Sequence, residues 1–151
     1  MRRIGGKGLA LIQAYEQFRS LPYRDAVGIW TYGFGAIRDA GGLPVTAATP
    51  PLGMDEGARL LARDCAQAAG AVQRLIFVPL DPDPFDALCS FAFNLGGGAL
   101  QRSTLRQVLN RGEAPDEDLF ARWDMAGGRH LAGLRRRRLA EWELFAGHAA
   151  G

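Results

Sequence analysis

Within the first 35 residues, the spacing of the apolar side chains changes from that of a helix to that of a strand. This change constrains the fold more than any other feature of the sequence. From about residue 6 to residue 18, Leu9, Ile12 and neighbouring apolar residues recur at helical spacing. From Tyr23 to Phe34 the side chains alternate instead, which is typical of two strands joined by a turn near residues 26–28. We therefore expect an α+β protein, mainly α, with a small N-terminal hairpin.

The rest of the chain has the pattern of helices separated by glycine and proline. Residues 39–51 are rich in Gly, Ala, Thr and Pro and are expected to form a loop. Helices are expected over about 54–76, 85–95 and 104–110, from Pro115, and around 134–145, with glycines at 96–98 and 127–128 as helix stops. The 151 residues fit one domain, or two small lobes that the long helix could link.

Composition narrows the possible classes of protein. Hydrophobic residues make up 48% of the chain, which is enough for a buried core, so the sequence is neither disordered nor fibrous. No apolar run approaches the roughly 18 residues of a membrane span, and the start lacks the apolar segment of a secretory signal. We expect no stable membrane insertion, and any work outside the cytoplasm would need help or a separate leader.

Charged residues and cysteines point to neither nucleic acid nor metal. The formal net charge is +2, and no groove-reading motif accompanies the basic run Arg135–Arg138. We expect some of these arginines to be solvated and one or two to turn inward and pair with carboxylates. Cys65 and Cys89 fall among apolar residues and are interpreted as buried thiols in preference to a disulfide. Two cysteines and two distant histidines do not make a zinc site, so we expect no metal and no cofactor.

Glu16 is a candidate general acid. It follows Leu9 by seven positions and Ile12 by four, so its side chain leaves the expected helix beside apolar neighbours. It also lies in the last turn, where the negative end of the helix dipole disfavours a carboxylate. Both effects favour the protonated carboxyl that a general acid needs. On the helix alone, a glutamate that bends out into water remains the simpler interpretation.

Asp25 and Thr31 flank the expected turn of the hairpin. Asp25 precedes the turn and Thr31 follows it, so the two side chains can meet across the ribbon. The alternation also directs Thr31 away from Trp30 and Tyr32. Taken singly, an aspartate in an Asx-turn and a threonine chosen for its strand propensity explain each residue more simply.

The order of these elements and motifs resembles the phage-type lysozymes, the muramidase endolysins of glycoside hydrolase family 24. Glu16, Asp25 and Thr31 have the family's Glu-x8-Asp-x5-Thr spacing, and the resemblance runs from about Gly8 to Phe145. Further matching motifs are Thr31-Tyr-Gly-Phe-Gly35, Val78-Pro-Leu80, Phe85-Asp-Ala-Leu88, Phe91-Ala-Phe-Asn94, Gly96-Gly-Gly98, Ser103-Thr-Leu105, Trp123 with Gly127-Gly128, and Gly133-Leu134 followed by Arg136–Arg138 and Glu141.

The resemblance implies a lysozyme-like, two-lobed fold within a single domain, 1–151. It implies a hairpin lobe over about 20–52 and a helical lobe over about 77–147 that includes the N-terminal helix. The helix over about 54–76 would join the two lobes.

The resemblance also assigns roles to the three polar residues. Glu16 would protonate the glycosidic oxygen of the β-1,4 bond between N-acetylmuramic acid and N-acetylglucosamine in peptidoglycan. Asp25 and Thr31 would hold and activate the attacking water, as in an inverting hydrolase. Inverting glycosidases hold their two carboxyl groups about 6.5–9.5 Å apart, whereas retaining enzymes hold them about 5–5.5 Å apart.

Other positions follow from the same resemblance. The expected substrate-binding residues are Gly35 and Ile37 on the hairpin side of a sugar groove, with Phe93, Asn94 and Thr104 opposite. Phe93 is equally well interpreted as a core aromatic. Many members of the family have a histidine where this chain has Ala36, and we expect this difference to change packing and not activity. We also expect Arg136 or Arg137 to approach Glu16.

The resemblance implies an endolysin that lyses a bacterial host. The enzyme would be made in the host cytoplasm and would act as a monomer on the periplasmic side of the wall, with either a holin or a leader providing its route of release. A lytic transglycosylase, which adds no water, and a catalytically inactive cell-wall-binding module remain as alternatives. An arginine-dependent nucleic-acid binder is the weakest alternative.

Overall fold

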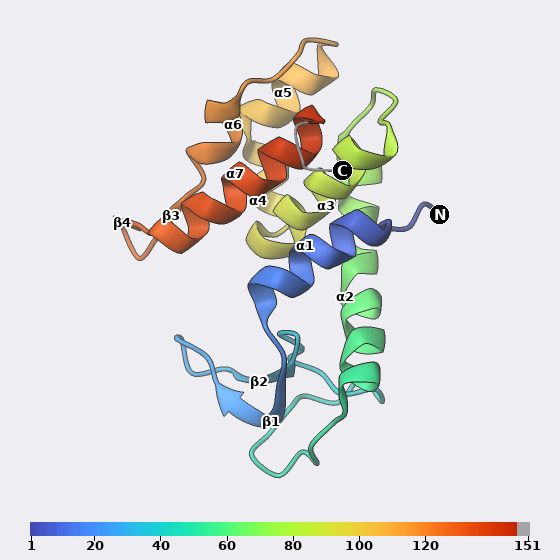
Figure 1. Ribbon diagram of the computed structural model, residues 1–151, viewed down its shortest axis with the longest axis vertical. Helices are drawn as coiled ribbons and strands as arrows, with labels where there is room; N and C mark the ends of the chain where they lie inside the picture. The colour runs from blue at the N-terminus through green and yellow to red at the C-terminus, as the bar shows by residue number, and fades with distance from the viewer. Residues whose placement is uncertain (148–151) are drawn as a thin grey trace. The chain divides into compact units, whose positions relative to one another are not determined.

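The computed structural model describes residues 1–147, which are mainly helical with two short antiparallel strand pairs (Figure 1). The elements in chain order are α1 (Gly6–Glu16), β1 (Arg19–Arg24), β2 (Trp30–Gly33), α2 (Met54–Leu75), α3 (Pro82–Leu95), α4 (Gly97–Arg102), α5 (Thr104–Asn110), α6 (Glu117–Ala121), β3 (Met125–Ala126), β4 (Arg129–His130) and α7 (Ala132–Ala146). The expected class, α+β and mainly α, is confirmed.

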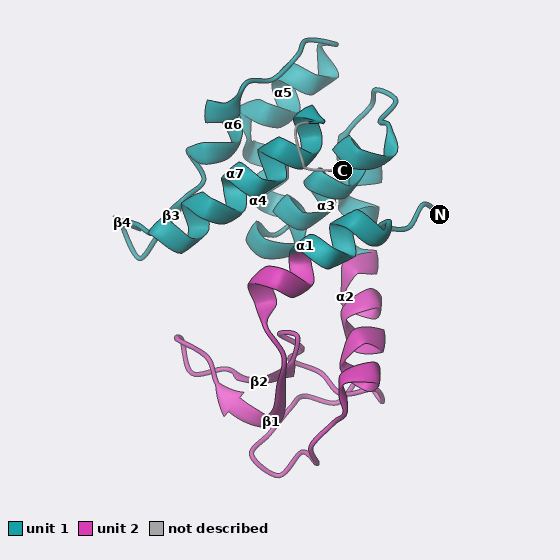
Figure 2. Ribbon diagram, viewed as in Figure 1, with its two compact units in different colours: residues 1–11, 67–151 teal, residues 12–66 magenta. Residues whose placement is uncertain are grey.

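The chain forms two compact units (Figure 2). One contains residues 12–66, and the other contains residues 1–11 together with the described chain from residue 67 onward. α1 and α2 each contribute residues to both units. Each unit also has its own hydrophobic cluster, so each is described separately below.

In the unit of residues 12–66, β1 and β2 form an antiparallel hairpin. Tyr23 lies opposite Thr31 and Arg24 lies opposite Trp30. The core of this unit consists of Tyr32, Ala36, Val45, Leu52 and Leu60, with Phe18 and Trp30 packed against it. Ala36 is therefore a buried core residue at the position where many relatives were expected to carry histidine.

The start of β1 corrects one sequence-based prediction. The helical spacing ran to about residue 18, but α1 already ends at Glu16 and β1 begins at Arg19. The helix ends earlier because Gln17 adopts the left-handed conformation with φ 51°. Pro22 is compatible with β1 because both strands of a two-stranded sheet are edge strands, where a missing N–H is tolerated.

In the other unit, α3 is the central helix. All residues from Phe85 to Ala92 are buried, and α3 packs against α4 and α7. The core around it includes Val72, Leu100, Leu105, Leu109, Leu119 and Phe120. Cys89 lies in this cluster, and Cys65 is buried in the unit of residues 12–66; both are thiols and not a disulfide, as expected.

The glycine clusters of this unit do more than end helices. Gly96 follows α3 with φ 89°, and α4 then begins at Gly97, a helix that the sequence did not predict. A Cβ at Gly97 would lie 3.1 Å from the Ala71 Cβ, so the glycine permits close packing. Gly127 and Gly128 both have positive φ and turn the chain between β3 and β4, a second hairpin that was also not predicted.

A buried aspartate holds the start of α1. Asp86 on α3 accepts hydrogen bonds from the Gly5 N–H at 2.8 Å and from the Gly8 N–H at 3.1 Å. It therefore satisfies two of the N–H groups that a helix N-terminus leaves without partners. A Cβ at Gly8 would lie 2.6 Å from Ile4 Cγ1 and 2.9 Å from Asp86 Cβ, so only glycine fits here.

α7 brings a charged cluster into the core of the same unit. Glu141 is fully buried and lies 2.7 Å from Arg138 Nε through Oε1, while its Oε2 accepts a hydrogen bond from Ser90 at 2.6 Å. Arg137 Nε lies 3.5 Å from the same carboxylate. Burial raises the pKa of Glu141, an effect opposed by Arg138, Ser90 and Arg137. The prediction that one or two arginines turn inward is confirmed.

Candidate active site

Glu16 is the last residue of α1 and is half-buried. The left-handed Gln17 directly after it is uncommon for a residue other than glycine, and it redirects the chain into β1. A Cβ built on Gly35 would lie 3.0 Å from Glu16 Oε2. The carboxyl group therefore lies against the backbone of Gly35, whose φ of 91° and missing side chain leave room for it.

Asp25 closes the turn between β1 and β2. Its Oδ1 accepts hydrogen bonds from the N–H groups of Val27 and Ile29, both at 2.9 Å. Its own N–H donates to the Ile29 carbonyl at 2.9 Å, and its carbonyl accepts from the Gly28 N–H at 3.0 Å. Gly28 has φ 87°. The carboxylate is thereby fixed through Oδ1, while no hydrogen bond from the described residues reaches Oδ2.

Thr31 lies on β2 and is only 4% exposed. Its hydroxyl donates to the Ile29 carbonyl at 3.0 Å, so the oxygen keeps its lone pairs as acceptors. Thr31 and Asp25 are thus both tied to Ile29, through its carbonyl and its N–H respectively. The register makes them diagonal neighbours across the hairpin, a separation of about 7–8 Å between Cα atoms. No direct hydrogen bond joins them.

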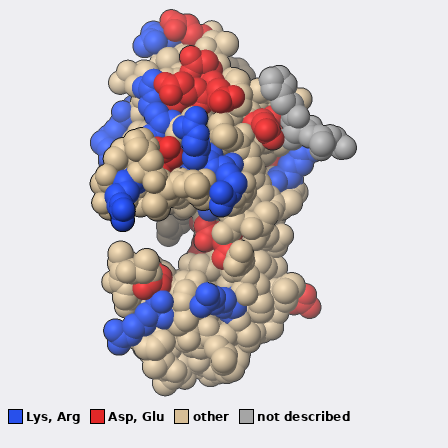
Figure 3. Space-filling view, turned by 60° about the vertical axis from the view of Figure 1, so that its left-hand side comes forward, with Lys and Arg blue, Asp and Glu red and all other residues tan. Residues whose placement is uncertain are grey.

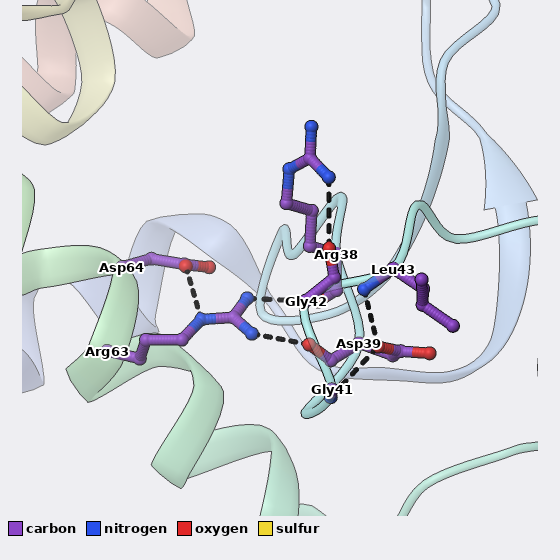
Figure 4. Close-up of polar contacts among 7 residues, drawn as sticks. All are labelled: Arg38, Asp39, Gly41, Gly42, Leu43, Arg63 and Asp64. Carbon is purple, nitrogen blue, oxygen red and sulfur yellow. Dashed lines mark hydrogen bonds and ion pairs between the residues drawn. The ribbon is translucent and has the colours of Figure 1, made fainter.

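The turn around Asp25 has a close counterpart in the same unit. Asp39 Oδ1 accepts from the N–H groups of Gly41 at 3.0 Å and Leu43 at 2.9 Å, and the Asp39 N–H donates to the Leu43 carbonyl at 2.9 Å (Figure 4). Gly42 matches Gly28, with φ 83° and an N–H that donates to the Asp39 carbonyl. The two segments share the pattern Asp-x-x-Gly followed by Ile or Leu. The need to close a turn therefore explains the presence of an aspartate at both positions. Only Asp25 lies in the hairpin that contains Thr31.

This second turn is a feature that the sequence analysis missed. Arg63 on α2 holds it by donating to the carbonyls of Arg38 at 2.9 Å and Asp39 at 2.5 Å. The repeated Asp-x-x-Gly pattern would have revealed the turn, but no sequence pattern indicated Arg63 as its partner. Burial, together with the charges of Asp39 and Glu56, raises the pKa of Tyr32 nearby, and Arg63 opposes this effect.

The expected substrate-binding residues lie in both units. Gly35 and the half-exposed Ile37 belong to the unit of residues 12–66. Phe93, Asn94 and Thr104 belong to the other unit. Phe93 is partly buried and packs against the core, Asn94 has a buried Oδ1 without a hydrogen-bond partner among the described residues, and Thr104 is exposed at the start of α5. The approach of Arg136 or Arg137 to Glu16 stays a prediction.

The described residues form no metal site, and the face drawn in Figure 3 is not uniformly basic. Within residues 1–147, no group of three or more His, Cys, Asp and Glu side chains is arranged to hold a metal ion. On the face drawn in Figure 3, Lys and Arg side chains lie beside Asp and Glu side chains, so the arginine-rich composition does not make this face uniformly basic. No helix in the described part of the chain is both long and apolar enough to cross a membrane.

Comparison with known proteins identifies the family of this chain. Residues 13–141 match the family model described as phage lysozyme. The chain is 35% identical to an endolysin of Acyrthosiphon pisum secondary endosymbiont phage 1 over 94% of this chain and 97% of that protein. It is 33% identical to the endolysin of Salmonella phage P22 over 91% and 94% of the two chains. A crystal structure of a P22 lysozyme mutant superposes with a TM-score of 0.85 at 30% identity, over 97% of this chain and 99% of that one.

The chain belongs to the phage lysozyme family, which makes it a glycosidase of the lysozyme type with a lysozyme-like fold. The name endolysin, shared by these relatives, fits its size and architecture.

Proposed function

We propose that this protein hydrolyses the β-1,4 bond between N-acetylmuramic acid and N-acetylglucosamine in bacterial peptidoglycan, with inversion at the anomeric carbon, to lyse a host cell. One observation carries this proposal. The Glu16 carboxyl lies against Gly35, in the same compact unit as a hairpin that carries Asp25 in its turn and Thr31 on β2, both hydrogen-bonded to Ile29.

Glu16 supplies the proton in this mechanism. Its carboxylic acid protonates the glycosidic oxygen as the bond to the anomeric carbon breaks, so that the leaving sugar departs as a neutral alcohol. The support is its position at the end of α1, half-buried, with the carboxyl group lying against the backbone of Gly35, where a Cβ atom would crowd it.

Asp25 and Thr31 orient the attacking water. Asp25 Oδ1 accepts hydrogen bonds from two backbone N–H groups, which leaves Oδ2 as an acceptor. The Thr31 hydroxyl donates its proton to the Ile29 carbonyl, so its oxygen can also accept a hydrogen bond. A water that donates one hydrogen bond to each oxygen presents its lone pair to the sugar. As its oxygen bonds to the anomeric carbon, the water gives a proton to Asp25. Solvent then restores both carboxyl groups.

The substrate contacts follow the family resemblance. We propose that Gly35, Ile37, Phe93, Asn94 and Thr104 bind the glycan. The unpartnered Oδ1 of Asn94 supports this assignment, because a buried acceptor gains a hydrogen bond when an N-acetyl or hydroxyl group reaches it.

We also propose that the enzyme works as a monomer and reaches the periplasmic side of the wall after release from the host cytoplasm, with a holin as the release partner. A relative from Escherichia phage Mu, 34% identical over 86% of this chain, is named a SAR-endolysin. This name differs from the name endolysin that the relatives described above carry.

Glu16→Gln tests the proposal, because glutamine keeps the size of the side chain and removes the proton. We expect the variant to fold and to lose at least about a hundredfold in the release of reducing ends from purified peptidoglycan. Glu143→Gln, which makes the same change at an exposed position of α7, is the matched control and should keep normal turnover. Near-normal turnover by Glu16→Gln would refute the mechanism.

A further inference from the structure

Arg63 on α2 hydrogen-bonds the backbone of the loop after Ile37. The Arg63 guanidinium uses all three of its nitrogens: Nη2 donates to the Arg38 carbonyl, Nη1 to the Asp39 carbonyl, and Nε to Asp64 Oδ1 at 3.0 Å (Figure 4). A planar guanidinium can bond two successive carbonyls and a carboxylate at once, which a lysine ammonium cannot do in the same geometry. Arg63 thus fixes the backbone on both sides of the Arg38–Asp39 peptide.

The side chain presented by this loop carries an uncompensated charge. Arg38 is exposed, and its Nη1 donates to the Gly42 carbonyl at 3.0 Å, which ties the guanidinium to its own loop. Among the described residues, no carboxylate lies within ion-pair distance of it. The neighbouring Asp39 carboxylate is instead engaged by two loop N–H groups. Two guanidinium nitrogens of Arg38 remain available to a ligand.

Two exposed apolar residues belong to the same loop as this cation. Ile37 is 51% exposed and Leu43 is 66% exposed, and the two residues lie on the two sides of the same turn. The loop therefore carries a charged group together with two exposed aliphatic side chains, on a backbone held by hydrogen bonds to the Asp39 carboxylate and from Arg63. Such a surface fits an anion that carries short alkyl groups.

We propose that Arg38 binds a free carboxylate of the stem peptides attached to the glycan, and that Arg63 positions it. This inference rests on the proposed function, because it extends the same substrate from the sugar to its peptide. The N-acetylated sugars are uncharged, and the lactyl carboxyl of muramic acid is used in the amide bond to the peptide. The anionic groups of the polymer therefore lie on the peptides, beside alanine methyl groups that match Ile37 and Leu43.

The test compares two insoluble wall preparations, both stripped of attached anionic polymers: one with free peptide α-carboxylates and one with the same carboxylates amidated. Binding is measured by sedimentation of the full-length protein with the wall. We expect the wild type to bind the free-carboxylate wall about fivefold more tightly, the scale of one exposed charge pair. Arg38→Gln should abolish this preference.

Two further variants separate a direct contact from general charge and from loop position. Arg59→Gln removes an equal charge from an exposed position of α2 and should leave the preference unchanged. Arg63→Lys keeps its charge but cannot hold both carbonyls, so the preference should shrink while the protein stays folded. Equal binding of both walls by the wild type, or an unchanged preference in Arg38→Gln, would overturn the inference.

Turnover provides a separate result. Release of reducing ends tests the proposed hydrolysis, whereas the difference in sedimentation tests Arg38. A protein that prefers the free-carboxylate wall without cleaving it would support this inference and refute the proposed function. A protein that cleaves both walls and binds them equally would do the reverse.

Discussion

At the scale of the residue, a comparison of Asp25 with Asp39 distinguishes a catalytic role from a role in forming the turn. Both aspartates accept two backbone N–H groups in the same geometry, so an asparagine at either position can keep those bonds through its own oxygen. We expect Asp25→Asn to lower turnover at least about a hundredfold, because an amide cannot take the proton of water. Asp39→Asn should lose less than about tenfold. Release of reducing ends measures the difference.

Urea unfolding of the same two variants provides the control. Their free energies of unfolding should fall by similar amounts, within about 1 kcal/mol of each other, because each loses the charge from an equivalent turn. Equal losses of turnover in both variants would mean that Asp25 acts only through the turn.

Single residues also show how far sequence reasoning reaches. Glu16 was expected in the last turn of the first helix, and α1 does end at this residue. Asp25 and Thr31 were expected to be able to meet across the hairpin, and the structure ties both of them to Ile29. The grip of Arg63 on residues 38 and 39 could not be predicted, because it depends on how a helix packs against a loop 24 positions away.

At the scale of the element, the start of α1 reverses the usual helix preference for alanine over glycine. Gly8→Ala should destabilise the protein by about 1–3 kcal/mol despite alanine's higher propensity, because its Cβ would meet Ile4 and Asp86. Gly6→Ala in the same helix has nothing within 4 Å of its Cβ and should be neutral or stabilising by up to about 1 kcal/mol. Denaturant midpoints compare the two, and equal changes would contradict the packing described here.

The hydrogen bond between Asp124 and His130 at the β3–β4 hairpin should make the stability of the protein depend on pH. His130 Nδ1 lies 2.7 Å from Asp124 Oδ1, and this hydrogen bond lowers the pKa of Asp124, partly offset by burial. A carboxyl with a lowered pKa in the folded state contributes stability above its unfolded pKa of about 3.9 and loses it as the pH falls through the folded value.

The comparison with Asp124→Asn measures this contribution. The wild type should have the higher Tm at pH 6, and the difference should shrink as the pH falls below about 4. A difference in Tm that stays constant from pH 6 to pH 3 would show that the carboxylate charge is not responsible.

Helices were predicted correctly where a single local sequence pattern, such as the spacing of apolar residues, dominates. The 54–76 helix was predicted from its spacing and is observed as α2, Met54–Leu75. α4 and the β3–β4 hairpin were missed because glycine was interpreted as a stop. At Gly97 the missing side chain instead allows contact with Ala71, and at residues 127–128 positive φ makes a tight turn. Both roles depend on the surroundings and not on glycine content alone.

At the scale of the whole molecule, the two compact units differ in what they contribute. Residues 12–66 contain Glu16, Asp25, Thr31 and the Arg63-held loop, and the other unit has the larger core, with the buried Glu141 cluster inside it. Family membership connects both units to one enzyme class, because the phage lysozyme match runs from residue 13 to residue 141.

The central claim is that water, held by Asp25 and Thr31, attacks from the face opposite Glu16. The most direct test is to digest purified peptidoglycan and follow the new muramic acid ends by mass spectrometry and by NMR of the anomeric proton. The account predicts hydrated, reducing ends that appear first as the α anomer. Ends lighter by one water, as an anhydro-sugar, or ends that appear first as the β anomer would contradict it.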